Sequence, residues 1–470
     1  MSDGAGFDGS AAAGPARGGL FGGLFDRGGA PAGDGAWLQA MLDTEAALAR
    51  ALERAGLAAD GAGAAVTAAA VAGRFDAAEL GRQAVHTGNP VPPLVRALTA
   101  AVPRWAASAV HHGATSQDIL DTAAMLMARD SLDAVLADLG TAAVAAAGLA
   151  AAHRDTIMIG RTLLQQAVPV TFGLVAAGWL TAIDEARRGL ARFRGERLAV
   201  QFGGAAGTLA VLGEAGPRVA ALLAGQLGLA RPALPWHTDR LRILELASAL
   251  AGAAAVLGKI ARDVTLLAQS EVAEVLEGGN GRGGSSAMPH KRNPVAAIVL
   301  LGCTRQVPGL LATLAVAAEQ EHQRAAGGWH AEWEPLADLL RLTGSAASWG
   351  AELLSGLRVD AGRMQANLDA AGGFPLAERV AALLAPALGP VAAHDLIAVA
   401  SADAAAAGDS LGGVLKSGAA AQALAAAGIS PDQVDAALDP AGYLGSAAAF
   451  TDAALTAHRE LEPSLRPSPA

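Results

Sequence analysis

Residue types suited to binding an anion and to moving a proton gather in one segment of the chain, residues 283–294. The segment reads Gly-Gly-Ser-Ser-Ala-Met-Pro-His-Lys-Arg-Asn-Pro, so two hydroxyls, an imidazole, two cations and an amide follow a glycine-rich entry. Lysine occurs only at 259, 291 and 416, and Lys291 beside Arg292 makes a local anion site in an acidic protein. These residues alone leave a plainer interpretation open, a solvated loop in which Pro294 merely starts a helix.

A second polar stretch, residues 111–118, reads His-His-Gly-Ala-Thr-Ser-Gln-Asp and directly precedes a long apolar segment. The hydroxyls of Thr115 and Ser116, together with the first backbone N–H groups of a helix starting here, would suit a carboxylate. Taken alone, such residues are more often an ordinary helix N-cap.

Long alanine-rich segments predict the helices that must position these stretches. They cover residues 118–154, 168–199, 238–277 and 294–324, the last with a kink expected at Pro308. Residues 239–277, which contain no proline, would extend roughly 55–60 Å as one helix. Alanine favours helices and is depleted from strands, so the sequence predicts an all-α fold with a long antiparallel helical bundle.

Composition and charge exclude several classes of protein. The 470 residues include 34 Lys+Arg and 44 Asp+Glu, and a net charge of −10 argues against a nucleic-acid partner, which needs a basic face. The single cysteine, Cys303, excludes an internal disulfide framework and fits a reducing cytoplasm. The N-terminus has no basic, apolar leader. The longest uncharged run, 162–183, contains Pro169 and predicts a buried helix core, so we expect a soluble cytoplasmic protein without a membrane partner.

The sequence predicts neither a metal site nor a cofactor. The ten histidines show no His-Glu-x-x-His spacing, and Cys303 has no second cysteine with which to share an ion. Glycine pairs such as Gly203-Gly204 lack the Gly-x-x-x-x-Gly-Lys-Ser/Thr pattern of a phosphate-binding loop.

Residues 284–294 resemble the signature loop of the fumarase/aspartase superfamily, whose general pattern is Gly-Ser-Ser-x-x-Pro-x-Lys-x-Asn. The resemblance implies that Ser285 is the catalytic acid/base and that Lys291 and Asn293 bind a substrate carboxylate. Residues 111–118 resemble a second superfamily region, which implies that Thr115 and Ser116 bind a carboxylate with His111 nearby.

The same resemblance implies a three-domain all-α fold and a homotetramer with shared active sites around a central helical bundle. The expected divisions are a flexible extension over 1–20, an N-terminal helical domain over 21–112, the long-helix bundle over 113–355 and a C-terminal helical domain over 356–470.

Residues 160–167, Gly-Arg-Thr-Leu-Leu-Gln-Gln-Ala, are similar to a third superfamily region that in many members reads Thr-His-x-Gln. Its histidine helps proton transfer. Leu163 stands at that position here, and an apolar side chain cannot move a proton. The resemblance also adds Thr162, Gln165 and Arg324 to the expected substrate-binding residues.

The bacterial 3-carboxy-cis,cis-muconate cycloisomerases lack this histidine and typically carry tryptophan there, and the sequence resembles them over about residues 20–460. Leu163 departs from their tryptophan, and Gln323 departs from their usual glutamate. The resemblance implies a lactonising cycloisomerase that interconverts 3-carboxy-cis,cis-muconate and 4-carboxymuconolactone in the protocatechuate branch of the β-ketoadipate pathway, acting on a small polycarboxylate without a cofactor.

Two other functions stay open. One is a fumarate-releasing lyase of the same superfamily that acts on a substituted succinate, such as adenylosuccinate or nitrosuccinate. Trp329 and Trp333 stand where an adenylosuccinate lyase would hold its nucleotide phosphate, which weakens the nucleotide version. The other is a non-catalytic helical oligomer. The joint presence of five residues argues against it: Ser285, Lys291, Asn293, Thr115 and Ser116.

Overall fold

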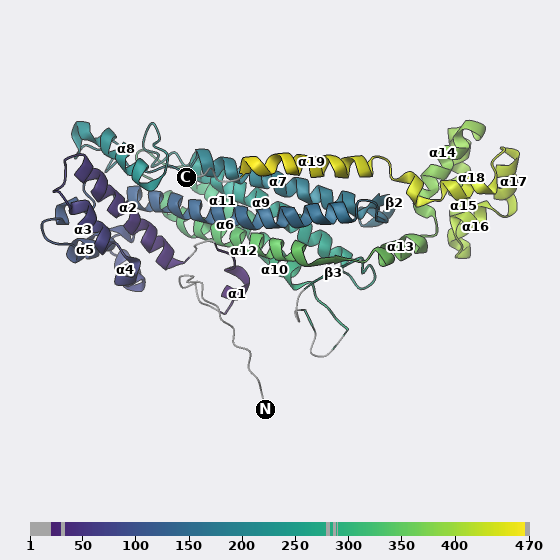
Figure 1. Ribbon diagram of the computed structural model, residues 1–470, viewed down its shortest axis with the longest axis horizontal. Helices are drawn as coiled ribbons and strands as arrows, with labels where there is room; N and C mark the ends of the chain where they lie inside the picture. The colour runs from purple at the N-terminus through teal and green to yellow at the C-terminus, as the bar shows by residue number, and fades with distance from the viewer. Residues whose placement is uncertain (1–19, 30–32, 279–282, 285–287, 289, 466–470) are drawn as a thin grey trace, which may run out of the picture. The chain divides into compact units, whose positions relative to one another are not determined.

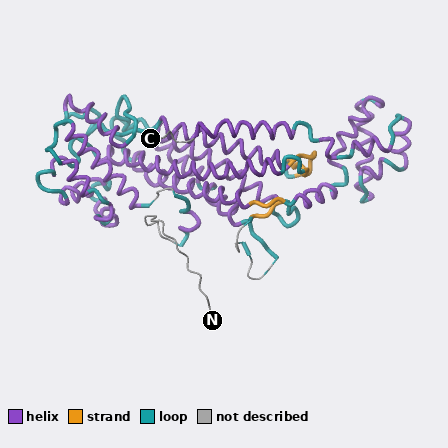
Figure 2. The backbone as a smooth tube through the Cα atoms, in the orientation of Figure 1, coloured by secondary structure: helices purple, strands orange, loops and turns teal. Residues whose placement is uncertain are grey.

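The structure is a computed structural model that describes residues 20–29, 33–278, 283–284, 288 and 290–465. Helices predominate, and the strands of this described part form two small antiparallel two-stranded sheets, β1–β2 and β3–β4 (Figure 2). The all-α prediction is therefore confirmed. The expected extension over 1–20 lies almost wholly outside the described residues.

The helices are labelled in Figure 1: α1 (Gly22–Phe25), α2 (Asp34–Arg54), α3 (Ala62–Ala69), α4 (Ala77–Ala84), α5 (Val91–Ala101), α6 (Ser116–Ala152), α7 (Phe172–Glu196), α8 (Gly216–Leu227), α9 (Leu241–Leu267), α10 (Val295–Thr304), α11 (Val307–Ala317), α12 (Gly328–Gly356), α13 (Ala361–Ala370), α14 (Ala377–Leu388), α15 (Pro390–Ala407), α16 (Leu411–Leu415), α17 (Gly418–Ala426), α18 (Pro431–Ala437) and α19 (Ala447–Leu465). The strands are β1 (Ile157–Thr162), β2 (Gln165–Thr171), β3 (Val275–Glu277) and β4 (Leu357–Val359).

The chain divides into two compact units, each assembled from separated segments. Unit 1 comprises residues 1–140, 186–258 and 299–350, and unit 2 comprises residues 141–185, 259–298 and 351–470. The three-domain division expected from the sequence stays a prediction.

Helix α6 confirms the first long helix expected from the sequence. Its 37 residues extend about 56 Å at 1.5 Å per residue. Alanine, leucine and methionine dominate it and no proline interrupts it, which favours an unbroken helix. Its first turns also bury polar side chains, Gln117, Asp118 and Asp121, which a purely structural apolar helix would not need.

The prediction of a helix starting near residue 168 is wrong by a few residues, because a β-hairpin precedes α7. Strand β1 pairs with β2 from Ile157 opposite Thr171 to Thr162 opposite Gln165. Branched apolar residues alternate along both strands, and Ile159 packs with Leu368 and Ala371 in a small core. The uncharged run 162–183 is therefore divided between this hairpin and α7, and is not the single buried helix that we expected.

Two further long helices are shorter than predicted. Helix α9 ends at Leu267, so it extends about 40 Å where the sequence predicted 55–60 Å for residues 239–277. The chain turns there, as the N–H of Ala273 donates to the carbonyl of Gln269, and then enters β3. The helix expected over 294–324 with a kink at Pro308 is instead divided in two: α10 ends at Thr304, and α11 starts at Val307 with Pro308 in its first turn and ends at Ala317.

Among the residues that the structure describes, three helical stretches are long and apolar enough to cross a membrane by length and composition: Ser116–Ala152, Leu241–Leu267 and Val295–Ala317. None of them is the run 162–183. The first contains buried carboxylates, Asp118 and Asp121, that bond to other segments of unit 1, which is the pattern of a helix packed inside a protein.

Within unit 2, α14 to α18 gather around a core of their own (Figure 1). Fully buried Val380, Leu384, Leu411 and Leu415 form its centre. This group encloses no predicted site residue.

Candidate active site

The stretch 111–118 lies in unit 1 and ends in the first turn of α6, as the sequence predicted. The helix begins at Ser116, and the N–H of Thr115 donates to Oδ2 of Asp118 at 3.0 Å while the N–H of Asp118 donates to the carbonyl of Thr115 at 2.9 Å. Among the residues that the structure describes, the hydroxyls of Thr115 and Ser116 have no hydrogen-bond partner. Both are partly exposed, so a carboxylate is able to reach them.

His111 faces a fully buried glutamate, Glu45 of α2. Glu45 accepts from the backbone N–H of His111 at 2.9 Å and from its Nδ1 at 2.6 Å. Burial disfavours the charged imidazole, but the hydrogen bond and the negative charge of Glu45 outweigh it and raise the pKa of His111 above its ordinary value. His111 therefore carries a positive charge at higher pH than an isolated histidine does, close in sequence to the hydroxyls of Thr115 and Ser116.

Replacing Glu45 by glutamine is expected to weaken substrate binding near neutral pH. Burial would then be opposed only by the negative charge of Asp118, so the pKa of His111 would fall and its positive charge would disappear at lower pH. We expect KM at pH 8 to rise about tenfold, which corresponds to about 1.4 kcal/mol. The measurement is KM from pH 5.5 to 9, with the rise of KM starting at lower pH in Glu45→Gln than in the wild type.

The same pair predicts how stability depends on pH. Because the folded-state pKa of His111 is raised, the contribution of this residue to the free energy of unfolding is fully present below the pKa of the unfolded chain. It is lost as pH rises through the folded value.

The control for the KM measurement on Glu45→Gln is Glu214→Gln, which removes an exposed glutamate of unit 1. Identical KM profiles in Glu45→Gln and the wild type would contradict the assignment of the charge to His111.

Arg324 lies against the same region, with its N–H groups directed at the protein. It donates from Nη1 to Oε1 of Gln117 at 3.0 Å and from Nη2 to the carbonyl of Gly204 at 2.7 Å, and from Nε to the carbonyl of Ala205 at 3.2 Å. Burial lowers the pKa of Arg324, although Asp118 and Asp121 oppose the shift. The structure thus brings Arg324 to the start of α6, and its direct contact with substrate stays a prediction.

A buried ionic group supports this region from behind. Arg240, 2% exposed, donates to both carboxylate oxygens of Asp121 and of Glu332 at 2.6–3.1 Å. Trp329, one of the two tryptophans noted in the sequence, is buried and donates from Nε1 to Oδ1 of Asp121 at 3.0 Å. Trp329 is therefore a core residue that holds the ionic group in place.

In unit 2, Thr162 and Gln165 face each other across the tip of the β1–β2 hairpin, and both are exposed. The tip itself is Leu163-Leu164, and both residues have positive φ, 51° and 65°. A two-residue turn of this hand normally carries glycine or asparagine, so two leucines are costly here. Leu163 is 96% exposed, so the tip of the hairpin carries an exposed apolar side chain.

An ion pair anchors the hairpin just before its tip. Arg161 donates to both oxygens of fully buried Glu274, from Nη1 at 2.8 Å and from Nη2 at 2.7 Å, and Asn367 of α13 donates to the same carboxylate at 2.8 Å. This bidentate geometry fixes the direction of the strand that leads to Thr162.

The two ends of the segment that carries the signature loop are hydrogen-bonded to each other. The N–H and the side-chain amide of Asn293 both donate to the carbonyl of Gly283, at 2.9 and 3.1 Å, and Gly283 has φ +79°. A Cβ on Gly283 would lie 2.2 Å from the carbonyl oxygen of Asn293, so only glycine fits there. Lys291 is exposed, whereas Ser285 lies outside the described residues and its role stays a prediction.

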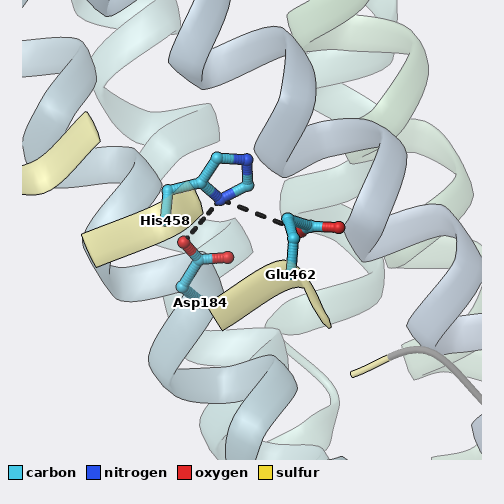
Figure 3. Close-up of side chains that lie close together, drawn as sticks. All are labelled: Asp184, His458 and Glu462. Carbon is cyan, nitrogen blue, oxygen red and sulfur yellow. Dashed lines mark hydrogen bonds and ion pairs between the residues drawn. The ribbon is translucent and has the colours of Figure 1, made fainter. Parts of the chain in front are cut away.

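Away from these residues, the part of the chain described here contains one group of side chains that could hold a metal ion, Asp184, His458 and Glu462 of unit 2. Figure 3 shows the imidazole of His458 between the two carboxylates. Its Nδ1 lies 2.8 Å from Oδ2 of Asp184, a hydrogen-bond distance, and 3.9 Å from Oε1 of Glu462. We interpret the group as a hydrogen-bonded contact that holds α19 against α7.

Replacing His458 by alanine is expected to lower the free energy of unfolding by about 1–3 kcal/mol, because the buried carboxylate of Asp184 loses this donor. Glu462→Gln, at the longer distance, is the control and should have a smaller effect. Thermal unfolding checks both. A rise of Tm on adding Zn²⁺ that disappears in His458→Ala would instead show that the three side chains hold a metal.

Sequence reasoning missed the buried partners of the site. Glu45, His237, Arg240 and Glu274 each contact a segment far away in the chain, and a pattern of neighbouring residues carries no signal for such a contact. Asp118 stood inside a recognised stretch, yet its role in holding Gly203 and Gly204 was not visible.

Comparisons with known proteins identify the family. The family described as lyase matches residues 35–309. The 3-carboxy-cis,cis-muconate cycloisomerase of Bradyrhizobium diazoefficiens is 48% identical over 423 residues, which cover 89% of this chain and 93% of that protein. The chain belongs to the 3-carboxy-cis,cis-muconate cycloisomerase family of the fumarase/aspartase superfamily.

Other members of the superfamily are also close to this chain. The crystal structure of the 3-carboxy-cis,cis-muconate lactonizing enzyme from Pseudomonas putida is 43% identical and covers 94% of this chain and 99% of its own, with a TM-score of 0.87. The nitrosuccinate lyase of Streptomyces davaonensis is 47% identical over 434 residues, 90% of each chain. The similarity to the Pseudomonas putida structure confirms the fold of this chain. The similarity to the nitrosuccinate lyase makes a test of the substrate necessary.

Proposed function

We propose that this enzyme is a lactonising cycloisomerase that interconverts 3-carboxy-cis,cis-muconate and 4-carboxymuconolactone. A relative with the cycloisomerase name, at 48% identity over 89% of the chain, supports this substrate. The structural observation that carries the proposal is the pair of unengaged hydroxyls, Thr115 and Ser116, at the start of α6, a few residues after His111 with its raised pKa. Hydroxyls, helix N–H groups and an imidazolium together suit a substrate with several carboxylates.

In the proposed reaction one carboxylate attacks an alkene carbon of the diene, and a proton is delivered to the neighbouring carbon. The intermediate carries extra negative charge on another carboxylate, and Lys291, Asn293 and the two hydroxyls stabilise that charge. Ser285 donates the proton in lactonisation and removes it in the reverse direction. Leu163 provides an apolar wall at the hairpin tip in place of the histidine that other superfamily members use, so the proton transfer rests on Ser285.

The proposed assembly is a cytoplasmic homotetramer whose active sites are shared between subunits, and the pathway is the protocatechuate branch of aromatic catabolism. His111, Thr115 and Ser116 belong to unit 1, whereas Thr162, Gln165, Lys291 and Asn293 belong to unit 2. Light scattering should give four times the chain mass of 46.6 kDa. Mixing inactive Thr115→Val and inactive Lys291→Met subunits should restore part of the activity, since some mixed sites would contain neither change.

The test of the proposed reaction is an ultraviolet assay on the purified enzyme. We expect the conjugated diene of 3-carboxy-cis,cis-muconate to disappear rapidly without added metal. The parallel assay follows fumarate release from nitrosuccinate and from adenylosuccinate. Fumarate release without loss of the diene would overturn the proposal in favour of a lyase, and Leu163 would then be the first residue to replace.

A further inference from the structure

One buried carboxylate, that of Asp118, joins three segments of unit 1. Its Oδ1 accepts from the N–H of Gly203 at 3.0 Å and from Nε2 of His237 at 2.7 Å. Its Oδ2 accepts from the N–H of Gly204 at 2.9 Å and from the N–H of Thr115 at 3.0 Å. Four donors on a side chain that is 1% exposed hold the start of α6 in one position.

Arg324 holds the same glycine turn from its carbonyl side. It donates to the carbonyls of Gly204 and Ala205 and to Oε1 of Gln117, the residue directly before Asp118. The amides of the turn therefore bind Asp118 and its carbonyls bind Arg324, so the turn has little freedom to move relative to α6.

The glycine turn is shaped for this contact. A Cβ on Gly203 would lie 2.7 Å from Cε1 of His237, and Gly204 has φ +66° with its Cβ position 3.0 Å from the carbonyl oxygen of Gly113. Larger residues at either position would separate the turn from the stretch that carries Thr115.

The contact also explains why the hydroxyls of the site are available. At an ordinary helix start the hydroxyl of the capping threonine accepts a backbone N–H two or three residues on. Here the N–H of Asp118 donates to the carbonyl of Thr115, and the carboxylate of Asp118 takes the N–H of Thr115 in return. The oxygen of the Thr115 hydroxyl is thereby left for a ligand.

We propose that Asp118, with His237 and Arg324, is a positioning residue that presents the hydroxyls of Thr115 and Ser116 to a substrate carboxylate. This inference rests on the proposed function, because it concerns the carboxylate-binding part of that site. Asp118 itself does not touch the substrate: its four contacts are all with the protein.

The test is Asp118→Asn, which keeps the shape of the side chain but removes its charge and replaces one acceptor by a donor. We expect KM to rise and kcat/KM to fall about a hundredfold. We also expect the dissociation constant of the saturated tricarboxylate propane-1,2,3-tricarboxylate, measured by calorimetry, to rise at least tenfold. His237→Leu, which removes a single donor, should change both quantities in the same direction by less.

A structural control is Thr122→Val, one turn further along α6. Thr122 is fully buried and its hydroxyl bonds to the backbone of Gln201, so this change should lower Tm without changing KM or the tricarboxylate affinity. Unchanged KM and unchanged tricarboxylate affinity in Asp118→Asn and His237→Leu, together with a lower Tm, would overturn the positioning role.

The two readouts separate this inference from the proposed function. If the wild type binds the tricarboxylate but leaves the diene intact, the proposed reaction fails, while a weaker affinity in Asp118→Asn still supports the positioning role. If Asp118→Asn does not fold, His237→Leu decides: unchanged affinity and KM there would overturn the inference.

Discussion

Replacing Arg240 by methionine is expected to lower the free energy of unfolding by about 3–5 kcal/mol, the largest effect on stability that we expect of a single substitution. The guanidinium lies between Asp121 and Glu332, and all three side chains are buried. Methionine fills a similar volume but leaves the two buried carboxylates of Asp121 and Glu332 without a positive charge between them. Removing one partner of a buried ionic group is costly because the remaining charges cannot return to water.

Chemical unfolding, followed by circular dichroism, checks the Arg240→Met result. Burial already raises the pKa of Glu332 although Arg240 opposes the shift, so part of the loss should be recovered at low pH, where Glu332 takes up a proton. Arg194→Met is the matched control, because Arg194 forms an exposed pair with Asp133, and we expect a loss below about 1 kcal/mol. Equal losses in the two variants would contradict the importance of the buried group.

Replacing Ser285 by alanine is expected to lower kcat about a thousandfold with little change in KM. A positioned acid/base contributes roughly 10²–10⁴ to a rate, and Leu163 at the hairpin tip has no group that would move the proton instead. The assignment of Ser285 rests on the resemblance of residues 284–294 to the signature loop. In the described part of this segment, the side-chain amide of Asn293 donates to the carbonyl of Gly283.

The assay for Ser285→Ala is the loss of diene absorbance at saturating substrate. Ser286→Ala, the neighbouring hydroxyl, is the matched control and should keep most of kcat. A Ser285→Ala enzyme with kcat close to the wild type would show that another group moves the proton, and the exposed imidazole of His290 in the same loop would be the first to test.

The sequence by itself determined the helical class, the family and the chemical residue types of this protein. Alanine-rich segments without proline predict helices from local preference alone, and α6 begins within two residues of its predicted start. The stretches 111–118 and 284–294 identify hydroxyls, lysine and asparagine because these residues are neighbours in the chain. The comparisons then confirmed the cycloisomerase family that those stretches indicated.

Local preference did not determine where the long helices stop. The β1–β2 hairpin replaced the first turn of a predicted helix, because Ile159 packs against Leu368, some two hundred residues away in the sequence. Helix α9 ended ten residues early because the chain after Leu267 pairs β3 with β4. Both endings depend on partners that a run of alanine and leucine does not specify.

Only the tertiary structure decided the charge and the availability of the site groups. Burial acts against the charge of His111, but its pKa is raised because Glu45, 66 positions earlier, bonds to its imidazole. The hydroxyl of Thr115 is left for a ligand because the N–H of Asp118 donates to the carbonyl of Thr115 instead. Arg324 reaches Gln117 across 207 positions. Burial and long-range contacts set these properties, because a pKa and a free hydroxyl depend on what surrounds a side chain in space.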